Sequence, residues 1–445
     1  MRSKRLRALA IIAALLPQAV PAEGLLQIYR SALAHDPVYG SARAARDAGL
    51  ESLPQGLAQL LPAVSASAFT QYNDLNLSFR GAAPPSQRVG NTNGFTVSLT
   101  QPLFNWQSLM VYKEAGFKAA QAEAQFGQAT QDLIVRVSQA YFDVLASQDS
   151  LAFIQAQKLA ISEQLAQAKR NFEVGTATIT DTHEAQARFD LAVSQEIAAQ
   201  NDLEIKQRAL QQIIGSFPER LTLLRSKVEM NVPKPNVMEE WAQAAETQSY
   251  PVRVQEAAVE IAKYEIERNR SGHLPTVNLV GNVGQNSQAF SSIGLASVAS
   301  DVVTRNIGVQ VAIPLYSGGN ASSLIRQAVA NREKVQQDLE SSRRSAALSA
   351  RQSFLGVTNG MAQVKALEQA LVSSETALAS NKLGYEVGVR INIDVLNSQQ
   401  QVFSTKRDLS KARYDTIMAG LKLKAAAGTL SEADLEEVNR LLGTD

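Results

Sequence analysis

The chain carries the stretch Phe172-Glu-Val-Gly-Thr-Ala-Thr-Ile-Thr-Asp181 and repeats it as Tyr385-Glu-Val-Gly-Val-Arg-Ile-Asn-Ile-Asp394. The two stretches begin 213 residues apart, since 385 minus 172 is 213. Each lies between two long segments with helical spacing, and each ends in an aspartate. We interpret them as equivalent turns between helices at the narrow end of a tube.

The repeat extends well beyond these turns. Leu61-Pro62 matches Leu274-Pro275, and Ile214-Gly215 matches Ala427-Gly428, again 213 residues apart. This fixed offset predicts two copies of one unit of roughly 200 residues, a period far longer than that of common solenoid repeats. The expected division is a first repeat at 23–230 with a hairpin at 63–103, a second repeat at 231–428 with a hairpin at 276–316, and a tail at 429–445 near a mixed equatorial region.

The N-terminus has the pattern of an export signal. Four basic residues precede a short apolar segment at 8–16, and Val20-Pro-Ala22 supplies a small-residue cleavage site. The apolar segment is too short for a permanent membrane anchor, although an uncleaved anchor is the alternative. Residues 1–22 are therefore predicted to be a signal peptide.

The composition excludes several classes of protein. The 445 residues include no cysteine, which excludes disulfide frameworks and thiolate metal sites. The net charge of +1 gives no sign of a nucleic-acid partner. Alanine makes up much of the 45% hydrophobic share and only 6% of residues are aromatic, a balance typical of long, closely packed helices.

Polar–apolar alternation predicts two β-hairpins. In the first copy Phe95, Val97 and Leu99 alternate with polar residues after a strand-like segment at 63–75 and a polar loop at 76–93. The second copy shows the same alternation on both sides of a loop at 284–304. A period of two indicates strands with one apolar and one polar face, here four strands of roughly ten residues.

Strands of this kind suit either an outer membrane or a half-buried soluble sandwich. Four strands cannot close a membrane barrel, because the smallest barrels need about eight and open edges are not tolerated in lipid. If the strands face lipid, several chains must share one barrel, and three chains would supply 12 strands, by arithmetic from the four predicted here.

Long helices follow each hairpin. Helical spacing without proline runs over about 108–172 and again over about 321–385, so each helix is on the order of 95 Å long. After Asp394, apolar residues recur every seven positions, which predicts coiled-coil packing. The first copy keeps this pattern less well, because Glu196 and Lys206 interrupt it.

The sequence shows no catalytic chemistry. The three histidines, His35, His183 and His273, lack metal-ligand spacing, and motifs for phosphate, dinucleotide or serine-nucleophile sites are absent. Asp181 and Asp394 resemble a carboxylate pair, but no sugar-binding aromatics accompany them. We expect no enzyme activity, no cofactor and no metal.

Two roles stay open for the turn residues. In the first, Thr180 or Asp181, and Asn392 or Asp394, cap helices by accepting hydrogen bonds from free N–H groups. In the second, the aspartates form a ring of carboxylates that attracts cations at a constriction. Tyr385 and Arg390 would then tie the two turns together through exposed links worth about 1 kcal/mol or less each.

At these residues the chain resembles the TolC-like outer-membrane factors over nearly its full length. The two turn stretches carry the resemblance most specifically, and further matches are Gly272-His-Leu-Pro275, Pro314-Leu-Tyr-Ser-Gly-Gly319 and Ala427-Gly-Thr-Leu430. The resemblance implies an α+β membrane protein: a homotrimer with a shared 12-stranded β-barrel in outer-membrane lipid and an α-barrel of coiled-coil-like helices across the periplasm.

The resemblance also implies partners and a function. Such proteins are passive ducts that join a periplasmic membrane-fusion adaptor to an inner-membrane transporter of the ABC, RND or MFS type. Their cargo is drugs or, in type I secretion, proteins, and the sequence leaves this choice open. The alternative is a periplasmic helical-hairpin adaptor or scaffold without a channel, although no lipoyl-like β-domain is evident.

Site residues follow from the same resemblance. Tyr385 would bond Asp181 and Arg390 would bond Thr180, which together hold the entrance closed. Asp394 would form an acidic entrance ring, and Asn397 occupies the position of the family's second aspartate, which predicts weaker cation binding. The adaptor's tips would contact two Val-Gly pairs, Val174-Gly175 and Val387-Gly388.

Overall fold

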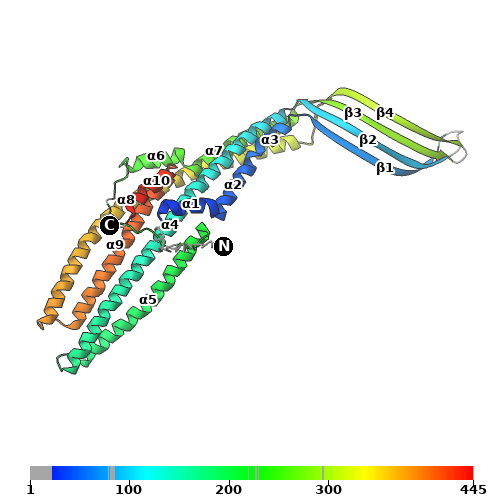
Figure 1. Cartoon of the computed structure of the whole chain (residues 1–445). Coiled ribbons are helices and arrows are strands. Elements are labelled where there is room, and N and C mark those ends of the chain that lie inside the picture. Colours follow the sequence, from blue (N-terminus) through cyan, green and yellow to red (C-terminus); the bar gives the residue numbers. More distant parts are fainter. Residues whose placement is uncertain are drawn as a thin grey trace, which may run out of the picture. The chain divides into compact units, whose positions relative to one another are not determined.

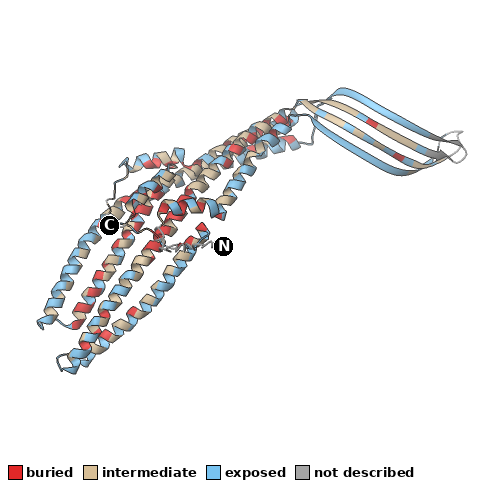
Figure 2. Ribbon diagram, viewed as in Figure 1, coloured by how far each residue is buried: buried red, intermediate tan, exposed pale blue. Residues whose placement is uncertain are grey.

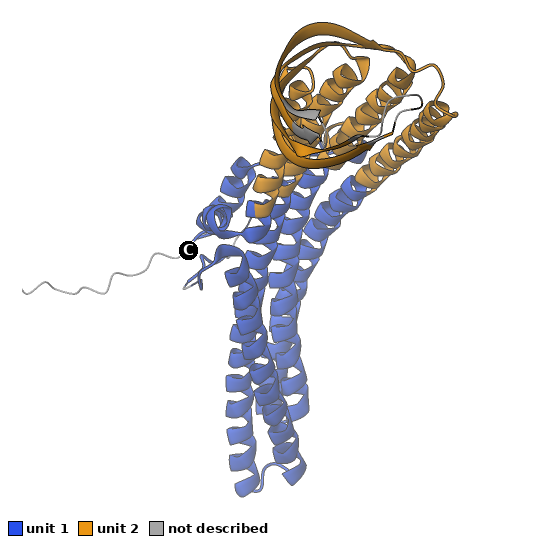
Figure 3. Ribbon diagram, turned by 90° about the vertical axis from the view of Figure 1, so that its right-hand side faces the viewer, with its two compact units in different colours: residues 1–40, 130–241, 349–445 blue, residues 41–129, 242–348 orange. Residues whose placement is uncertain are grey.

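The computed structural model describes residues 23–78, 80, 86–218, 220–225, 228, 230–292 and 295–443. The predicted signal peptide lies outside these residues. The chain forms two compact units, each built from separate stretches (Figure 3): unit 1 from 1–40, 130–241 and 349–445, and unit 2 from 41–129 and 242–348. Each unit takes segments from both predicted repeats, so the units and the repeats divide the chain differently.

Three helices precede the first strand. They are α1 (Leu25–His35), α2 (Pro37–Leu50) and α3 (Ser52–Ala58). The first break falls at Asp36, whose carboxylate accepts a hydrogen bond from the Tyr39 amide at 2.9 Å and caps α2. Pro37 suits the first position of α2 because that position needs no N–H donor.

Four long helices dominate the chain (Figure 1): α4 (Trp106–Glu173), α5 (Ile179–Ile214), α8 (Asn320–Glu386) and α9 (Asn392–Ala426). The 68 residues of α4 span on the order of 100 Å. Both predicted long helices are confirmed to within two residues at each end. Shorter elements complete the set: α6 (Met238–Gln248), α7 (Tyr250–Arg270), the 3-10 turn η1 (Ser271–His273) and α10 (Glu432–Leu441).

The seven-residue repeat of α9 is buried as predicted. The side chains of this row are at most 6% exposed; they are Val395, Val402, Leu409, Thr416 and Leu423. The two residues that interrupt the pattern of α5 make ion pairs with α4 instead. Glu196 lies 2.5 Å from the Lys158 ammonium and Lys206 lies 3.5 Å from the Asp143 carboxylate, and the hydrogen bond from Lys158 lowers the pKa of Glu196.

The main core of unit 1 joins the two ends of the chain. Leu25 and Ile28 of α1 are buried in the same cluster as Tyr141 of α4 and Leu435 of α10, and Figure 2 shows buried residues gathered along these helices. The Tyr141 hydroxyl donates to the Thr222 carbonyl at 2.7 Å. Burial raises the pKa of Tyr141 well above its ordinary value, so this hydroxyl remains a neutral donor.

Unit 2 contains a four-stranded antiparallel sheet in the order β1-β2-β3-β4. The strands are β1 (Ala63–Leu77), β2 (Ser86–Phe104), β3 (Thr276–Ser292) and β4 (Leu295–Ala312). They are longer than the ten residues expected, and most of each predicted loop belongs to the ladder. Gly90 pairs with Asn73, and Gln288 with Ser300. The loop prediction was wrong because backbone pairing continues through polar residues that lack apolar alternation.

One face of the sheet is apolar and exposed. Val64, Leu99, Gly281 and Ile307 form one row across the four strands. Val64 is 68% exposed and Ile307 is 76% exposed. Strands β1 and β4 each have one neighbour in the part of the sheet that the structure describes. The chain therefore presents two open strand edges beside an uncovered apolar surface.

Candidate functional site

The two repeated turns have the same backbone. Gly175 and Gly388 take left-handed conformations with φ of 77° and 79°. Their amides donate to the carbonyls of Phe172 at 3.0 Å and Tyr385 at 3.1 Å. A left-handed residue just past a helix end favours glycine because a side chain there is strained. This requirement explains why glycine occurs at this position in both copies.

The first turn holds Asp181 in a capping box. The Asp181 carboxylate accepts hydrogen bonds from the Thr178 amide at 3.0 Å and the Thr178 hydroxyl at 2.8 Å. Thr178, and not Thr180, is the N-cap of α5, while the predicted alternative Asp181 takes part in the cap by accepting the Thr178 N–H. The Thr-x-x-Asp spacing is a variant of the capping-box pattern and was the signal that the sequence reasoning missed.

The second turn lacks this cap. Ile391 occupies the position equivalent to Thr178, and its side chain makes no cap hydrogen bond. Asp394 instead lies 3.6 Å from the Arg390 guanidinium, within the same turn. Asn392 is buried, and its Nδ2 has no hydrogen-bond partner among the described residues. The prediction that Asn392 or Asp394 caps this helix was wrong, because no side-chain cap hydrogen bond is formed. Among the described residues, the Asp394 carboxylate has the ion pair with Arg390 at 3.6 Å.

The predicted latch residues lie at the two turns but have other partners in this chain. The Asn171 side chain donates to the Tyr385 hydroxyl at 3.2 Å, while Asp181 is occupied by Thr178 and Arg390 by Asp394. The structure therefore joins the turns through Asn171, a residue that no sequence motif singled out. The pairs Tyr385–Asp181 and Arg390–Thr180 stay predictions for the assembled protein.

Arg188 makes a second link between the hairpins. Its guanidinium donates to the side-chain oxygen Oε1 of Gln400 at 2.7 Å and to the side-chain oxygen Oδ1 of Asn397 at 2.9 Å. Arg188 is on α5 and both acceptors are on α9, so Asn397, the predicted replacement of a second aspartate, is an amide bound to a cation. No sequence pattern indicated this contact, because nothing in the spacing relates residue 188 to residue 397.

The predicted adaptor residues are at the surface. Val174 is 73% exposed and Val387 is 65% exposed, and a Cβ added at Gly175 or Gly388 would meet nothing within 4 Å. Both turns thus present an apolar side chain next to open space. This is a surface that a partner could contact.

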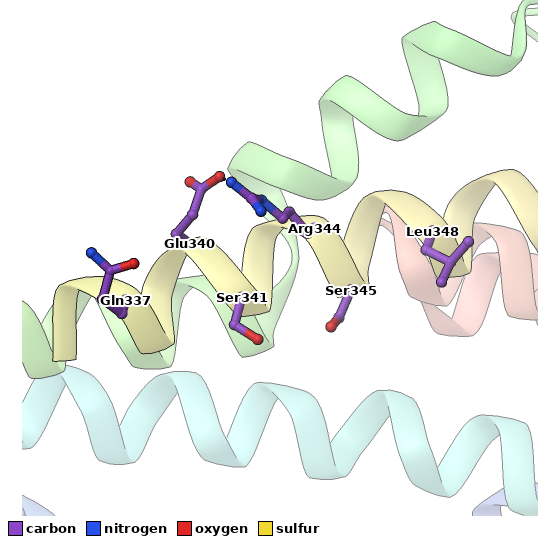
Figure 4. Close-up of a pocket in the computed structure, with 6 residues that line it drawn as sticks. All are labelled: Gln337, Glu340, Ser341, Arg344, Ser345 and Leu348. Carbon is purple, nitrogen blue, oxygen red and sulfur yellow. Dashed lines mark hydrogen bonds and ion pairs between the residues drawn. The ribbon is translucent and has the colours of Figure 1, made fainter. Parts of the chain in front are cut away.

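The part of the chain that the structure describes shows no catalytic arrangement. A shallow groove of about 350 Å³ runs along α8. Glu340 and Arg344 form an ion pair there at 2.8 Å, and Ser341 and Ser345 point away from them (Figure 4). No group of three or more potential metal ligands occurs among the described residues. In the same residues, none of the helices combines the length and hydropathy needed to cross a bilayer.

Comparison with known proteins identifies the architecture. The family model described as "Outer membrane efflux protein" matches residues 28–216 and again 241–429. The two matches are offset by 213 residues, as 241 minus 28 shows, which is also the offset between the two turn stretches.

Individual relatives agree with the family model. Outer membrane protein TolC of Vibrio cholerae is 35% identical over 98% of this chain and 98% of its own length. Alkaline protease secretion protein AprF of Pseudomonas aeruginosa is 32% identical over 93% of this chain and 86% of its own. The CmeC outer membrane channel of Campylobacter jejuni has a TM-score of 0.79 at 16% identity, covering 95% of this chain and 90% of that one. The alternative of a periplasmic adaptor or scaffold is therefore not favoured.

Proposed function

Because the chain belongs to the outer membrane efflux protein family and is an outer-membrane duct for efflux or secretion with a helical periplasmic extension, we propose that three copies assemble into one passive channel. Each copy contributes its four strands to a shared barrel, which three copies bring to 12 strands. Each copy also contributes its long helices to an α-barrel. No chemistry is performed on the cargo.

The exposed apolar face of the sheet is the observation that carries this proposal. Ile307 is 76% exposed and Val64 is 68% exposed, and β1 and β4 are edge strands of the sheet as the structure describes it. Lipid satisfies the apolar face, but it cannot satisfy the free N–H and C=O groups of an edge. Pairing β4 of one copy with β1 of the next closes the ring and removes every edge.

The state of assembly tests this proposal. The mature protein, purified in detergent, should run as a heat-modifiable band in unheated gel electrophoresis and have three times the chain mass by native mass spectrometry. A well-folded monomer in detergent would contradict the shared barrel. In a planar bilayer the same preparation should conduct ions, and a folded trimer without conductance would contradict the duct.

We place the closed entrance at the two repeated turns. In the assembled duct, Tyr385 bonds Asp181 and Arg390 bonds Thr180. The proximity of the turns supports this pairing, since Tyr385 already bonds Asn171 on α4. The test compares single-channel conductance of the wild type with a variant carrying both Tyr385→Phe and Arg390→Ser. The expected result is a small conductance that rises sharply in the variant; an equal conductance in both would discard the latch.

Asp394 forms the acidic ring of that entrance. Since Ile391 supplies no capping hydroxyl, the Asp394 carboxylate is held by one ion pair at 3.6 Å. Asn397 is neutral, so three chains place three carboxylates at the entrance. The channel should therefore prefer cations, and multivalent cations should block its current only weakly. Asp394→Asn should abolish this block, with Asp408→Asn farther along α9 as the control; tight block in the wild type would refute the weakening.

The exposed valines of the turns are the proposed adaptor contact. Replacing the apolar group of Val174 or Val387 with a charge, as in Val387→Asp, should weaken capture of a periplasmic adaptor from the same genome without changing conductance. Unchanged capture would move the contact elsewhere. The inner-membrane transporter is of the ABC, RND or MFS type, and the cargo is drugs or proteins; the genes beside this one would separate these cases.

A further inference from the structure

We propose that Arg188 is a positioning residue of the entrance, a fork that ties α5 to α9 and must break before the two hairpins separate. This inference rests on the proposed duct, because the movement it restrains is the opening of that duct. It concerns contacts other than the predicted Tyr385 and Arg390 latch.

The geometry of the fork is that of a two-point clamp. One terminal nitrogen of Arg188 lies 2.7 Å from the Gln400 side-chain oxygen, and the other lies 2.9 Å from that of Asn397. The acceptors are one helical turn apart on α9, so a planar guanidinium reaches both at once. Rotation or sliding of α9 against α5 would break both bonds together.

Near the fork, the interface around Leu396 leaves some buried polar atoms without hydrogen bonds. Leu396 of α9 is buried against Ile161 of α4 and Ala192 of α5. By helical spacing, Asn392 and Gln399 flank Leu396 on α9. Asn392 Nδ2 and Gln399 Oε1 are buried without a hydrogen-bond partner among the described residues.

The facing hairpin shows the same pattern. Gln164 Oε1 on α4 and Thr182 Oγ1 on α5 are also buried without partners in the described chain. Each lies three residues from a member of the Leu396 cluster, beside Ile161 and Ala185 respectively. Buried polar atoms without partners disfavour the closed interface, and water satisfies them when it opens. The surface fork therefore adds attraction between α5 and α9 that offsets part of this cost.

The fork also changes the charge of the entrance. A carboxylate at 397 would add a negative charge, whereas Asn397 carries none and is bound to the Arg188 cation. Asn397→Asp would convert the amide contact into a charge-assisted pair and tighten the tie. This substitution should have two effects: it strengthens the contact between α5 and α9, and it adds negative charge at the entrance.

The test uses a thiol at the buried end of the interface. The chain has no cysteine, so Leu396→Cys introduces a single thiol at a position that is 4% exposed. A maleimide reaches it when α9 leaves α5. In this background, Arg188→Gln should accelerate labelling roughly fivefold, the size expected for the loss of one exposed hydrogen-bonded contact per chain.

The matched control is Arg208→Gln, which removes the same charge from the same helix. Arg208 bonds Glu204 and Gln211, both on α5, so its loss should leave labelling at the wild-type rate. Equal rates in the Arg188 and Arg208 variants would overturn the tie. Arg188→Lys keeps the charge but cannot bind two acceptors in one plane, so it should label as fast as Arg188→Gln; a wild-type rate in the lysine variant would overturn the fork.

A double-mutant cycle shows whether Arg188 acts through its two acceptors. In a chain with Asn397→Ala and Gln400→Ala, Arg188→Gln should add no further acceleration, whereas an additive effect would contradict the proposed contacts. Asn397→Asp should slow labelling. If labelling responds as expected but no protein conducts in a bilayer, the duct fails and the tie stands. If the wild type conducts and labelling is unchanged, the tie fails and the duct stands.

Discussion

The two turns differ at one capping position, and exchanging its residue predicts a measurable change. Thr178 and Ile391 are equivalent in the repeat, 213 residues apart by subtraction, and their backbones nearly coincide. Thr178 has φ −88° and ψ 158°, while Ile391 has φ −99° and ψ 160°. Ile391→Thr should therefore build the Thr178–Asp181 capping box at Asp394.

The expected gain is about 1 kcal/mol. Threonine at an N-cap stabilises a helix by roughly 0.5–2 kcal/mol relative to residues without an acceptor. Ile391 is 61% exposed, so the substitution removes little buried apolar surface. A free energy of about 1 kcal/mol corresponds to roughly fivefold less frequent opening of the first turn of α9.

Hydrogen exchange read by mass spectrometry measures this opening. A peptide covering 390–396 should exchange about fivefold more slowly in Ile391→Thr, and one covering 178–184 about fivefold faster in the reverse variant Thr178→Ile. The reasoning is refuted if Thr178→Ile loosens α5 while Ile391→Thr leaves α9 unchanged, since equal backbones would then not predict equal caps. Cation block should also weaken in Ile391→Thr, because the new hydroxyl binds Asp394.

Two further predictions concern other parts of the chain. Burial raises the pKa of Asp36, but hydrogen bonds from Arg136 and the backbone outweigh burial and lower it overall. The stabilisation is therefore complete above the ordinary pKa of about 3.9 and is lost as pH falls through the lower folded value; Asp36→Asn should flatten the acid side of a stability–pH profile from thermal melts, and an unchanged profile would contradict this account. In α4, a Cβ at Gly127 would lie 2.2 Å from the Tyr250 ring, whereas one at Gly116 meets nothing within 4 Å. Gly127→Ala should destabilise by about 1–3 kcal/mol, while Gly116→Ala should be neutral or stabilise by up to about 1 kcal/mol; equal melting temperatures would refute the clash.

The helical part of the fold was predictable because long helices leave a long signal. The proline-free segments placed α4 and α8 to within two residues at each end, and the seven-residue row from Val395 to Leu423 lies within α9. The sheet was harder. Its apolar half was visible in Phe95 and Val97. Its polar half pairs through backbone groups and through side-chain hydrogen bonds such as Asn73 to Thr92, which an apolar–polar pattern does not record.

The candidate site was predictable only where function depends on local geometry. The left-handed glycines and the capping aspartate at 181 follow from spacing within one turn. The contacts between the hairpins do not, because Tyr385 bonds Asn171 and Arg188 bonds Asn397 across more than 200 residues of sequence. Those pairings depend on how two helices are rotated about their axes, which no periodicity reports.

The core that joins α1 to α10 has a consequence for how the protein is made. Leu25 leaves the ribosome 410 residues before Leu435, by subtraction, yet both belong to one cluster. Unit 1 therefore lacks part of its interior until α10 has emerged, and the earlier helices cannot complete this core by themselves. A chain truncated before Glu432 should be cleared by proteases however well its hairpins form, because this part of the core stays open.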